Sequence, residues 1–299
     1  MPVQPKSRSS DKTSRPGPSV ADDLSQLWHG QSVELLKELH ILTREGRLNQ
    51  DSRRKLKQVY HLYRFLEKPL EELGQGGAAV SLADHGAGKS YLGFIINDLF
   101  FRGGQAGCAP GHIYGIETRE ELVQRSRELA QRLGFGNMSF LHLSAADSAH
   151  SQALPERIDM VTALHACDTA TDDAIAFGLA RHARYMALVP CCQAEVASLL
   201  RQDKALSLSR TPLAELWRHP LHTREFGSQI TNVLRCLHLE AQGYQVTVTE
   251  LVGWEHSMKN ELILARHTGQ RKHSAAVRLR ELLDQFGLGP ALGGRFSLA

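Results

Sequence analysis

The residues best suited to chemistry lie in the stretch 80–90, where an acidic residue is followed by spaced glycines. The order is Asp84-x-Gly86-x-Gly88, after a short apolar run and directly before a helical pattern of apolar residues. Glycines allow a strand to turn sharply into a helix and let the backbone pass close to a ligand. The amides at the start of the helix then face an anionic or polar group. The stretch predicts a nucleotide-type binding loop.

Two ligands compete for this loop. The spacing Ala83-x-x-x-x-Gly88-Lys89-Ser90 nearly fits a phosphate-binding P-loop, with alanine in place of the first glycine. The acidic residue and the glycines also fit the loop that holds S-adenosylmethionine in Rossmann-type methyltransferases, with Ser90 in place of the usual third glycine. The carboxylate of Asp84 would repel a triphosphate, whereas it would stabilise a sulfonium ligand that carries an ammonium group. We therefore expect S-adenosylmethionine as the cofactor, with a P-loop nucleotide site as the alternative.

Acidic residues after the next two predicted strands are candidates for holding the nucleoside. Glu117 closes the second strand, and an acidic residue at that place after a glycine-rich turn is what a ribose diol requires. Asp147 follows the third strand, where its carboxylate could accept the adenine amino group. Thr118, directly after Glu117, is included in the predicted cofactor site. Together with Glu121, it also predicts a capping box for the next helix.

Four further candidates, His165, Asp168, Cys191 and Cys192, follow the fourth and fifth predicted strands. The carboxyl ends of parallel strands form the edge at which open α/β sheets bind ligands. The first interpretation is direct methyl displacement, with His165 or Asp168 removing a proton. The second is attack by Cys191 or Cys192 on C6 of a pyrimidine. The third is a zinc site that includes Cys167, but neighbouring strand residues point apart, so no metal is predicted.

The elements that must position these residues alternate between strands and helices. Five strands alternate with helices, and two further strands, near 244–248 and 261–265, follow each other too closely for a helical crossover. This order predicts an α/β fold with a Rossmann-like, seven-stranded sheet. Its terminal strand is antiparallel, and an N-terminal helical extension precedes it. Class I methyltransferases end in this way, and P-loop proteins usually do not.

The chain divides into four parts by composition and pattern. The predicted parts are a disordered tail (1–18), an N-terminal helical region (19–75), an S-adenosylmethionine-dependent methyltransferase domain (76–268), and a C-terminal helix and tail (269–299). In the second part, apolar spacing predicts a helix over 51–68. Pro69 is expected to end or kink that helix.

Composition limits the setting of the protein. The net charge is +3, with an excess of basic residues in both tails, which is compatible with RNA binding. No apolar run is long enough to cross a bilayer, and the first residues lack the apolar core of a secretory signal. Five cysteines, an odd number in a chain of this length, do not indicate a disulfide framework. These features predict a cytoplasmic protein with no membrane partner.

Four separated motifs within 70–267 together resemble one group of methyltransferases. The motifs are Asp84–Ser90, Leu164–Asp172, Pro190–Gln193 and Glu255–Leu262. The group includes the methyltransferase region of the glutathione S-transferase C-terminal domain-containing protein. The chain is also similar, more distantly, to the eukaryotic tRNA ribose 2′-O-methyltransferases that act on the acceptor stem. The N-terminal helices lie outside the part that resembles the group.

This resemblance implies a seven-stranded sheet, S-adenosylmethionine as the methyl donor, and roles for individual residues by position. The methionine end would contact Asp84, Gly86, Ala87 and Gly88. Ribose would contact Glu117 and adenine would contact Asp147, while His165 would lie beside the transferable methyl group.

From the motifs and the basic tails we expect an S-adenosylmethionine-dependent methyltransferase that acts on RNA, with tRNA as the expected class. A small-molecule or protein acceptor remains an alternative. So does a methyltransferase fold that serves only as a binding module. The sequence leaves the oligomeric state open.

Overall fold

A computed structural model places most of the 299-residue chain. It describes residues 23–28, 30–75, 77, 79–102, 110–164, 168–191, 193–202, 212–251 and 261–298. Three candidate site residues, His165, Cys167 and Cys192, lie outside the described residues, as does the segment 252–260 of the fourth motif.

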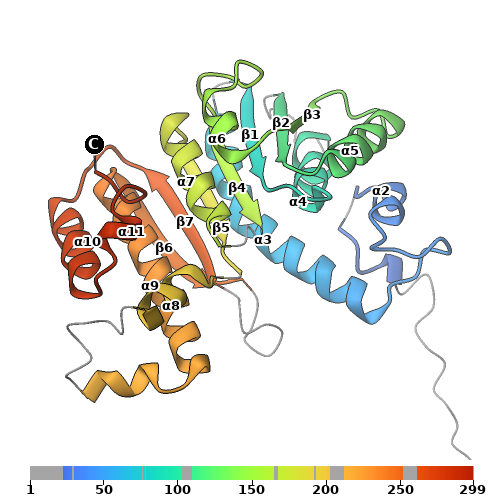
Figure 1. The fold of residues 1–299 in the computed structure, drawn as a ribbon. Helices are drawn as coiled ribbons and strands as arrows, with labels where there is room; N and C mark the ends of the chain where they lie inside the picture. The colour runs from blue at the N-terminus through green and yellow to red at the C-terminus, as the bar shows by residue number, and fades with distance from the viewer. Residues whose placement is uncertain are drawn as a thin grey trace, which may run out of the picture.

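Seven strands form one sheet in the order β3-β2-β1-β4-β5-β7-β6 (Figure 1). The strands are β1 (Val80–His85), β2 (Gly111–Glu117), β3 (Met138–His142), β4 (Met160–Leu164), β5 (Tyr185–Val189), β6 (Tyr244–Glu250) and β7 (Glu261–His267). The first five pair in parallel, whereas β7 is antiparallel to both β5 and β6. A parallel return from β6 would need a crossover of about a dozen residues or more, which residues 251–260 cannot supply. The predicted α/β sheet with an antiparallel terminal strand is confirmed.

Helices cover both faces of this sheet. They are α2 (Val33–Glu38), α3 (Gln50–Gly74), α4 (Tyr91–Ile96), α5 (Glu120–Arg132), α6 (Ala145–His150), α7 (Ala170–Ala180), α8 (Glu195–Gln202), α9 (Pro220–Ala241), α10 (His273–Gln285) and α11 (Gly289–Leu292). A π-helical segment, Asn97–Arg102, continues α4. Within the described residues, no helix combines the length and apolar character that crossing a membrane requires.

Helix α3 is the longest element and packs on the sheet. It begins after Asn49, whose side chain accepts a hydrogen bond from the Ser52 amide, and it continues through Pro69. Of the two outcomes expected at Pro69, an end or a kink, the end is wrong. A proline inside a helix removes one backbone hydrogen bond. Here Leu66 and Leu70, on either side of the proline, are fully buried, and burial of each side chain contributes about 2 kcal/mol that offsets this loss.

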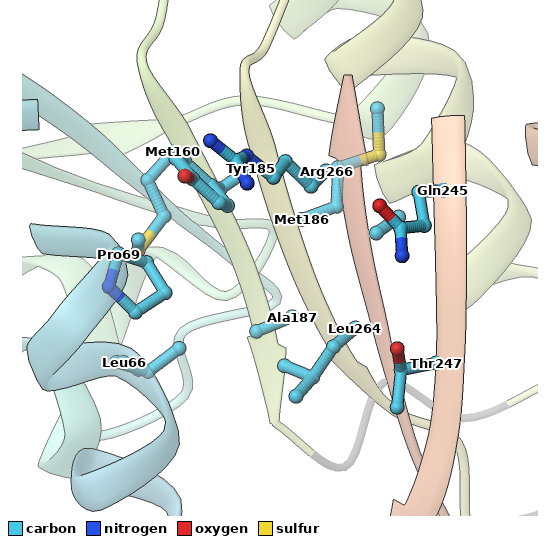
Figure 2. A pocket seen from close by; sticks show the side chains of 11 residues that line it. Leu66, Pro69, Met160, Tyr185, Met186, Ala187, Gln245, Thr247, Leu264 and Arg266 are labelled. Carbon is cyan, nitrogen blue, oxygen red and sulfur yellow. The ribbon is translucent and has the colours of Figure 1, made fainter. Parts of the chain in front are cut away.

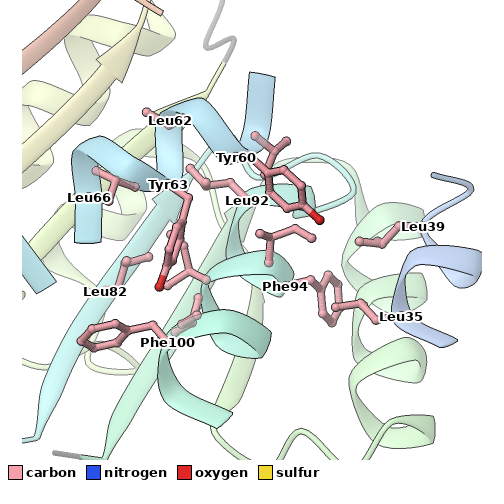
Figure 3. Packing of buried hydrophobic residues seen from close by; sticks show 14 of the residues in the cluster. Leu35, Leu39, Tyr60, Leu62, Tyr63, Leu66, Leu82, Leu92, Phe94 and Phe100 are labelled. Atoms are coloured by element: carbon pink, nitrogen blue, oxygen red, sulfur yellow. The ribbon is translucent and has the colours of Figure 1, made fainter. Parts of the chain in front are cut away.

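The core on this face joins the N-terminal helices to the sheet. Figure 3 shows Leu66 and Tyr63 of α3 beside Leu82 of β1, and Leu35 of α2 beside Phe94 of α4. All five side chains are almost fully removed from solvent. Because α2 and α3 share one apolar cluster with β1 and α4, these helices are held against the strand that leads into the glycine loop.

Helices α8 and α9 approach each other unusually closely at Gly227. A Cβ atom at Gly227 would lie 2.7 Å from the backbone nitrogen of Ala197 and 2.9 Å from its Cα atom. Only glycine permits this approach, because the atoms in the way belong to the backbone of α8. Since α8 begins shortly after β5, the contact also fixes the course of the segment that leaves the carboxyl end of β5.

We expect Gly227→Ala to lower the free energy of unfolding by about 1–3 kcal/mol, because the added methyl group must push α8 away from α9. This would reverse the usual effect, since alanine favours a helix interior by about 1 kcal/mol over glycine. Urea titration followed by circular dichroism measures the change. The control is Gly136→Ala, where a Cβ atom would meet nothing within 4 Å in the described structure. Equal stability of the two variants would show that the close approach is not required.

Candidate functional site

The loop after β1 has the backbone shape that its glycines predict. The φ angles of Gly86 and Gly88 are +66° and +57°, in the left-handed region that glycine adopts readily. The Ala87 amide donates to the carbonyl oxygen of Ile116 at 3.0 Å, so the loop is tied to the end of β2. A Cβ atom at Gly86 would meet no atom of the described residues within 4 Å. The turn therefore has open space above it, as a loop that receives a ligand requires.

Ser90 stands where the methyltransferase loop usually has its third glycine, and its backbone is also left-handed, with φ +49°. The Ser90 hydroxyl donates to Oδ2 of Asp84 at 3.2 Å, which offsets part of the cost of this conformation. Space for the serine comes from Gly93, where a Cβ atom would lie 2.5 Å from the Ser90 Oγ atom. Ser90 and Gly93 together thus replace the missing glycine.

Asp84 lies beneath this loop and is only 2% exposed. Its Oδ1 atom accepts a hydrogen bond from the Thr162 hydroxyl of β4 at 2.9 Å, and its Oδ2 atom accepts the bond from Ser90. Burial raises the pKa of the Asp84 carboxyl to about 6, although these hydrogen bonds act in the opposite direction. A carboxylate in such a place is stabilised in its charged form by any cation that binds nearby.

Glu117, at the end of β2, joins the glycine loop to the loop that follows β2. Its Oε2 atom accepts a hydrogen bond from the Gly88 amide at 2.7 Å, and its Oε1 atom accepts one from the Arg119 amide at 3.0 Å. The Arg119 guanidinium also contacts both oxygens, at 3.1 and 3.2 Å. Burial alone would raise the pKa of Glu117, but the bonds from Arg119 and Gly88 outweigh it and hold that pKa below its usual range. Glu117 is therefore a charged acceptor at the place predicted for a ribose.

Thr118 has a different role from the one its spacing suggests. Helix α5 begins at Glu120 with Arg119 as its N-cap, so the expected capping box of Thr118 and Glu121 is wrong. The Thr118 amide and hydroxyl instead donate to Oε1 of Glu117, at 3.0 and 3.3 Å. The carboxylate of the adjacent Glu117 thus satisfies both donors of Thr118, through charge-assisted hydrogen bonds.

Asp147 lies on the first turn of α6, just after β3. The Ser144 hydroxyl donates to its Oδ2 atom at 2.5 Å and accepts from its amide at 3.2 Å. The Asp147 side chain is exposed. The strands β1, β2 and β3 are neighbours in the sheet. Asp84 and Glu117 lie at the carboxyl ends of β1 and β2, and Asp147 follows β3. This is the row of carboxylates that the sequence predicts.

The two predicted catalytic residues that the structure describes follow β4 and β5. The Oδ1 atom of Asp168 accepts a hydrogen bond from the Ala194 amide at 3.3 Å, so this carboxylate ties the loop after β4 to the loop after β5. Cys191 is partly buried in the second of these loops. In the described part of the chain, no three side chains of the metal-binding types gather in a way that could hold a metal ion.

Arg235 of α9 supports the loop after β4 and the start of α7, and the sequence pattern did not single it out. Its guanidinium is fully buried and donates to Oδ1 of Asp172 at 2.5 Å and to the Asp168 carbonyl oxygen at 2.8 Å. It also donates to Oδ1 of Asn232 at 3.0 Å. Removing one partner of such a buried pair is costly, because a charge is left uncompensated. The available signal in the sequence was an arginine between two apolar residues, Leu234 and Cys236.

Thr162 was also missed. It is the one hydroxyl residue within the apolar strand Met160–Leu164, and a polar residue in a fully buried strand indicates a hydrogen-bond partner inside the fold. Its partner is Asp84 on the neighbouring strand.

A cavity of about 430 Å³ opens beside Cys191 at the carboxyl ends of β5 and β6. Its volume lies in the range of small-molecule sites. Three carboxylates line it, those of Glu225, Glu250 and Glu261. Asn232, which Arg235 contacts, donates to Oε2 of Glu261 at 2.6 Å and so orients one of them.

Two other cavities lie away from the predicted site residues. The one in Figure 2, of about 210 Å³, lies between Leu66 and Pro69 of α3 and the strands β5, β7 and β6. It is too small for a typical cofactor site, and none of the predicted site residues lines it. The second is lined by Lys89 together with Tyr91 and Leu122. A P-loop would direct this lysine at the phosphates over the loop, so its position does not favour the P-loop alternative.

Comparison with known families gives a match over the part of the chain that includes the glycine loop. A family model described as a methyltransferase domain matches residues 54–199, from within α3 into α8. The matched region contains the glycine loop, the row of carboxylates and the loops after β4 and β5. The chain has no match among curated proteins.

Solved structures with a similar fold are distant. Magnesium protoporphyrin IX methyltransferase from Synechocystis is 12% identical, with a TM-score of 0.45 over 78% of this chain and 94% of its own. An rRNA methylase from Streptococcus thermophilus is 9% identical, with a TM-score of 0.41 over 69% and 95%. Fibrillarin from Aeropyrum pernix, bound to S-adenosylmethionine, is 14% identical, with a TM-score of 0.39 over 69% and 76%. At these values none of the three bears on the methyl acceptor of this chain.

The part that matches a methyltransferase domain contains the glycine loop together with Asp84 and Glu117. A methyltransferase domain of this kind takes its methyl group from S-adenosylmethionine. The chain is an S-adenosylmethionine-dependent methyltransferase.

Proposed function

We propose that this methyltransferase transfers the methyl group to RNA, with tRNA as the expected class. The observation that carries the proposal is the amino-terminal half of α3. Between Asp51 and Glu67 this helix contains no acidic residue, and three of its basic residues, Arg53, Lys57 and Arg64, line one groove. Figure 1 shows this half of α3 projecting beyond the sheet toward α2. A basic, projecting helix is suited to the phosphates of RNA, and the resemblance of the motifs to tRNA methyltransferases points to the same class.

We infer the placement of the cofactor from the row of carboxylates. Asp84, with the turn Gly86–Gly88, is assigned to the methionine end, where the ligand carries its positive charges. Glu117 and Thr118 are assigned to the ribose, and Asp147 to adenine. The open space over Gly86 and the raised pKa of Asp84 support this fit. The side chain of Arg119 is 60% exposed. It would move away from Glu117 when ribose hydroxyls bind to that carboxylate.

For the chemical step we propose direct displacement at the carboxyl ends of β4 and β5. Bound S-adenosylmethionine supplies an electrophilic methyl group. The protein's part is to align the acceptor with that group and to receive a proton. Asp168 is the described residue assigned to the proton, and its bond to the Ala194 amide holds it in place. His165 shares this role by position. Cys191 and Cys192 are assigned to the wall of the acceptor site, with nucleophilic attack by one of them as the second mechanism.

We expect the affinity for S-adenosylmethionine to depend on the ionisation of Asp84. Its pKa is raised from 3.8 to about 6, so lowering the pH from 7.5 to 5 protonates the carboxyl and removes its attraction for the cationic ligand. The dissociation constant should rise about tenfold over this range, one pKa unit being a factor of ten. Asp84→Asn should bind weakly at both pH values and lose this dependence. Isothermal titration calorimetry measures both.

Stability provides the control for this substitution. Because the pKa of Asp84 is higher in the folded protein than in the unfolded chain, its ionisation costs stability as the pH rises from about 4 to about 6. Asp84→Asn should therefore remain at least as stable as the parent protein at pH 7.5. A variant that unfolds readily at this pH, or that binds the cofactor like the parent, would contradict the assigned role.

The acceptor class is tested by incubating the protein with methyl-labelled S-adenosylmethionine and total RNA from a strain that lacks the gene. We expect label in one RNA species, which RNase treatment removes and protease treatment leaves. The same incubation with the protein and small-molecule fractions of that strain is the control. Label in the protein or small-molecule fraction, with none in RNA, would show that the acceptor belongs to that fraction and is not RNA. Cofactor binding without transfer to any fraction would indicate a binding module.

A further inference from the structure

A groove runs along the amino-terminal half of α3, outside the site described above. It lies between this helix and two residues that precede it in the chain, Gln26 and Leu48. Its volume is about 470 Å³. Arg53, Lys57 and Arg64 line it, and no acidic residue is among the described residues that do so. The basic stretch of α3 therefore has a concave, positively charged side.

The basic residues of the groove and His61 share one side of the helix. Arg53, Lys57, His61 and Arg64 are spaced i, i+4, i+8 and i+11, which places them within about 80° around an α-helix at 100° per residue. From the first to the last, the helix rises about 16 Å. By contrast, Arg54 and Lys55 do not line the groove. The groove thus presents a row of positive groups rather than a single one.

Two of the arginines are held in place by the segment on the other side of the groove. Arg53 donates to Oδ1 of Asp23, whose second oxygen accepts a hydrogen bond from the Leu48 amide at 3.0 Å. The Arg64 guanidinium lies 5.5 Å from the centre of the Trp28 ring, over its face. Trp28 is itself stacked on Tyr60 of α3 at 4.9 Å. Side chains that are already ordered lose less conformational entropy when a ligand binds.

The acidic cavity beside Cys191 limits where a polyanion can lie. With Glu225, Glu250 and Glu261 along its walls, this cavity would repel phosphate groups. A polynucleotide can place a ribose or a base there only if its phosphates are held elsewhere. Among the described cavities, the groove on α3 has three basic lining residues and no acidic one.

We propose that the α3 groove binds the phosphate backbone of the RNA acceptor. The proposal rests on RNA being that acceptor. The groove binds phosphates as charges and does not read bases, so its contribution to affinity is independent of sequence and sensitive to salt. Three cations give a slope of log affinity against log salt of about −2 to −3.

The test compares two double variants of the full chain that remove the same charge. Lys57→Gln/Arg64→Gln changes the groove, and Arg54→Gln/Lys55→Gln changes the same helix outside it. Arg53 is kept because it is bonded to buried Asp23. Binding of fluorescently labelled bulk tRNA is measured by anisotropy between 50 and 200 mM KCl. We expect the groove variant to bind tRNA about tenfold more weakly at 50 mM KCl. Its slope of log affinity against log salt should become less steep by about 1.5. The control variant should change by less than twofold, and both should bind S-adenosylmethionine like the parent.

Equal tRNA affinity and equal slope for the two variants would overturn the groove proposal, even if the parent protein methylates RNA. Failure of the acceptor proposal has a different signature. In that case the parent transfers no label to RNA, whether or not it binds tRNA through the groove. Displacement of tRNA by polyglutamate of equal charge would also count against the groove, since it would show a site for acidic chains in general.

Discussion

The structure depends on a buried carboxylate, Asp84, that is paired with no cation among the described residues. Asp84 joins three elements, because it accepts hydrogen bonds from β4 through Thr162 and from the start of α4 through Ser90. Burial removes the hydration of this charge, and hydrogen bonds from neutral donors do not fully replace it, so the pKa of Asp84 is raised. A ligand with positive charge would complete the site. The same residue therefore shapes the glycine loop and prepares it for S-adenosylmethionine rather than for a phosphate.

Charged side chains also hold the loops that follow β1, β2 and β4 at this edge of the sheet. Glu117 bonds the glycine loop through Gly88 and the loop after β2 through Arg119. Arg235 bonds the Asp168 carbonyl and, through Asn232, orients Glu261 in the wall of the cavity beside Cys191. These bonds place the ends of β1, β2 and β4 relative to one another. Such preorganisation is what a displacement reaction needs, because its rate depends on alignment.

Charge is separated over the molecule in a way that suits a polyanionic acceptor. Carboxylates line the cavity next to Cys191, whereas the side of α3 that carries Arg53, Lys57 and Arg64 has none along its groove. Helix α3 reaches from the core under β1 to this groove, so one element both stabilises the sheet and supplies the basic surface. This links the N-terminal helices, which lie largely outside the motifs, to the function of the domain.

The sequence by itself determined the order of elements, the antiparallel last strand and the positions of the strand-end carboxylates. These follow from local spacing, since apolar periodicity, glycine turns and a short link between strands need no distant partner. Only the tertiary structure decided that α3 continues past Pro69, that Thr118 serves Glu117 instead of capping α5, and that Thr162 and Arg235 support the site. Each of these depends on burial or on a partner far along the chain. The free energy of such contacts is set by packing in three dimensions, which local spacing does not encode.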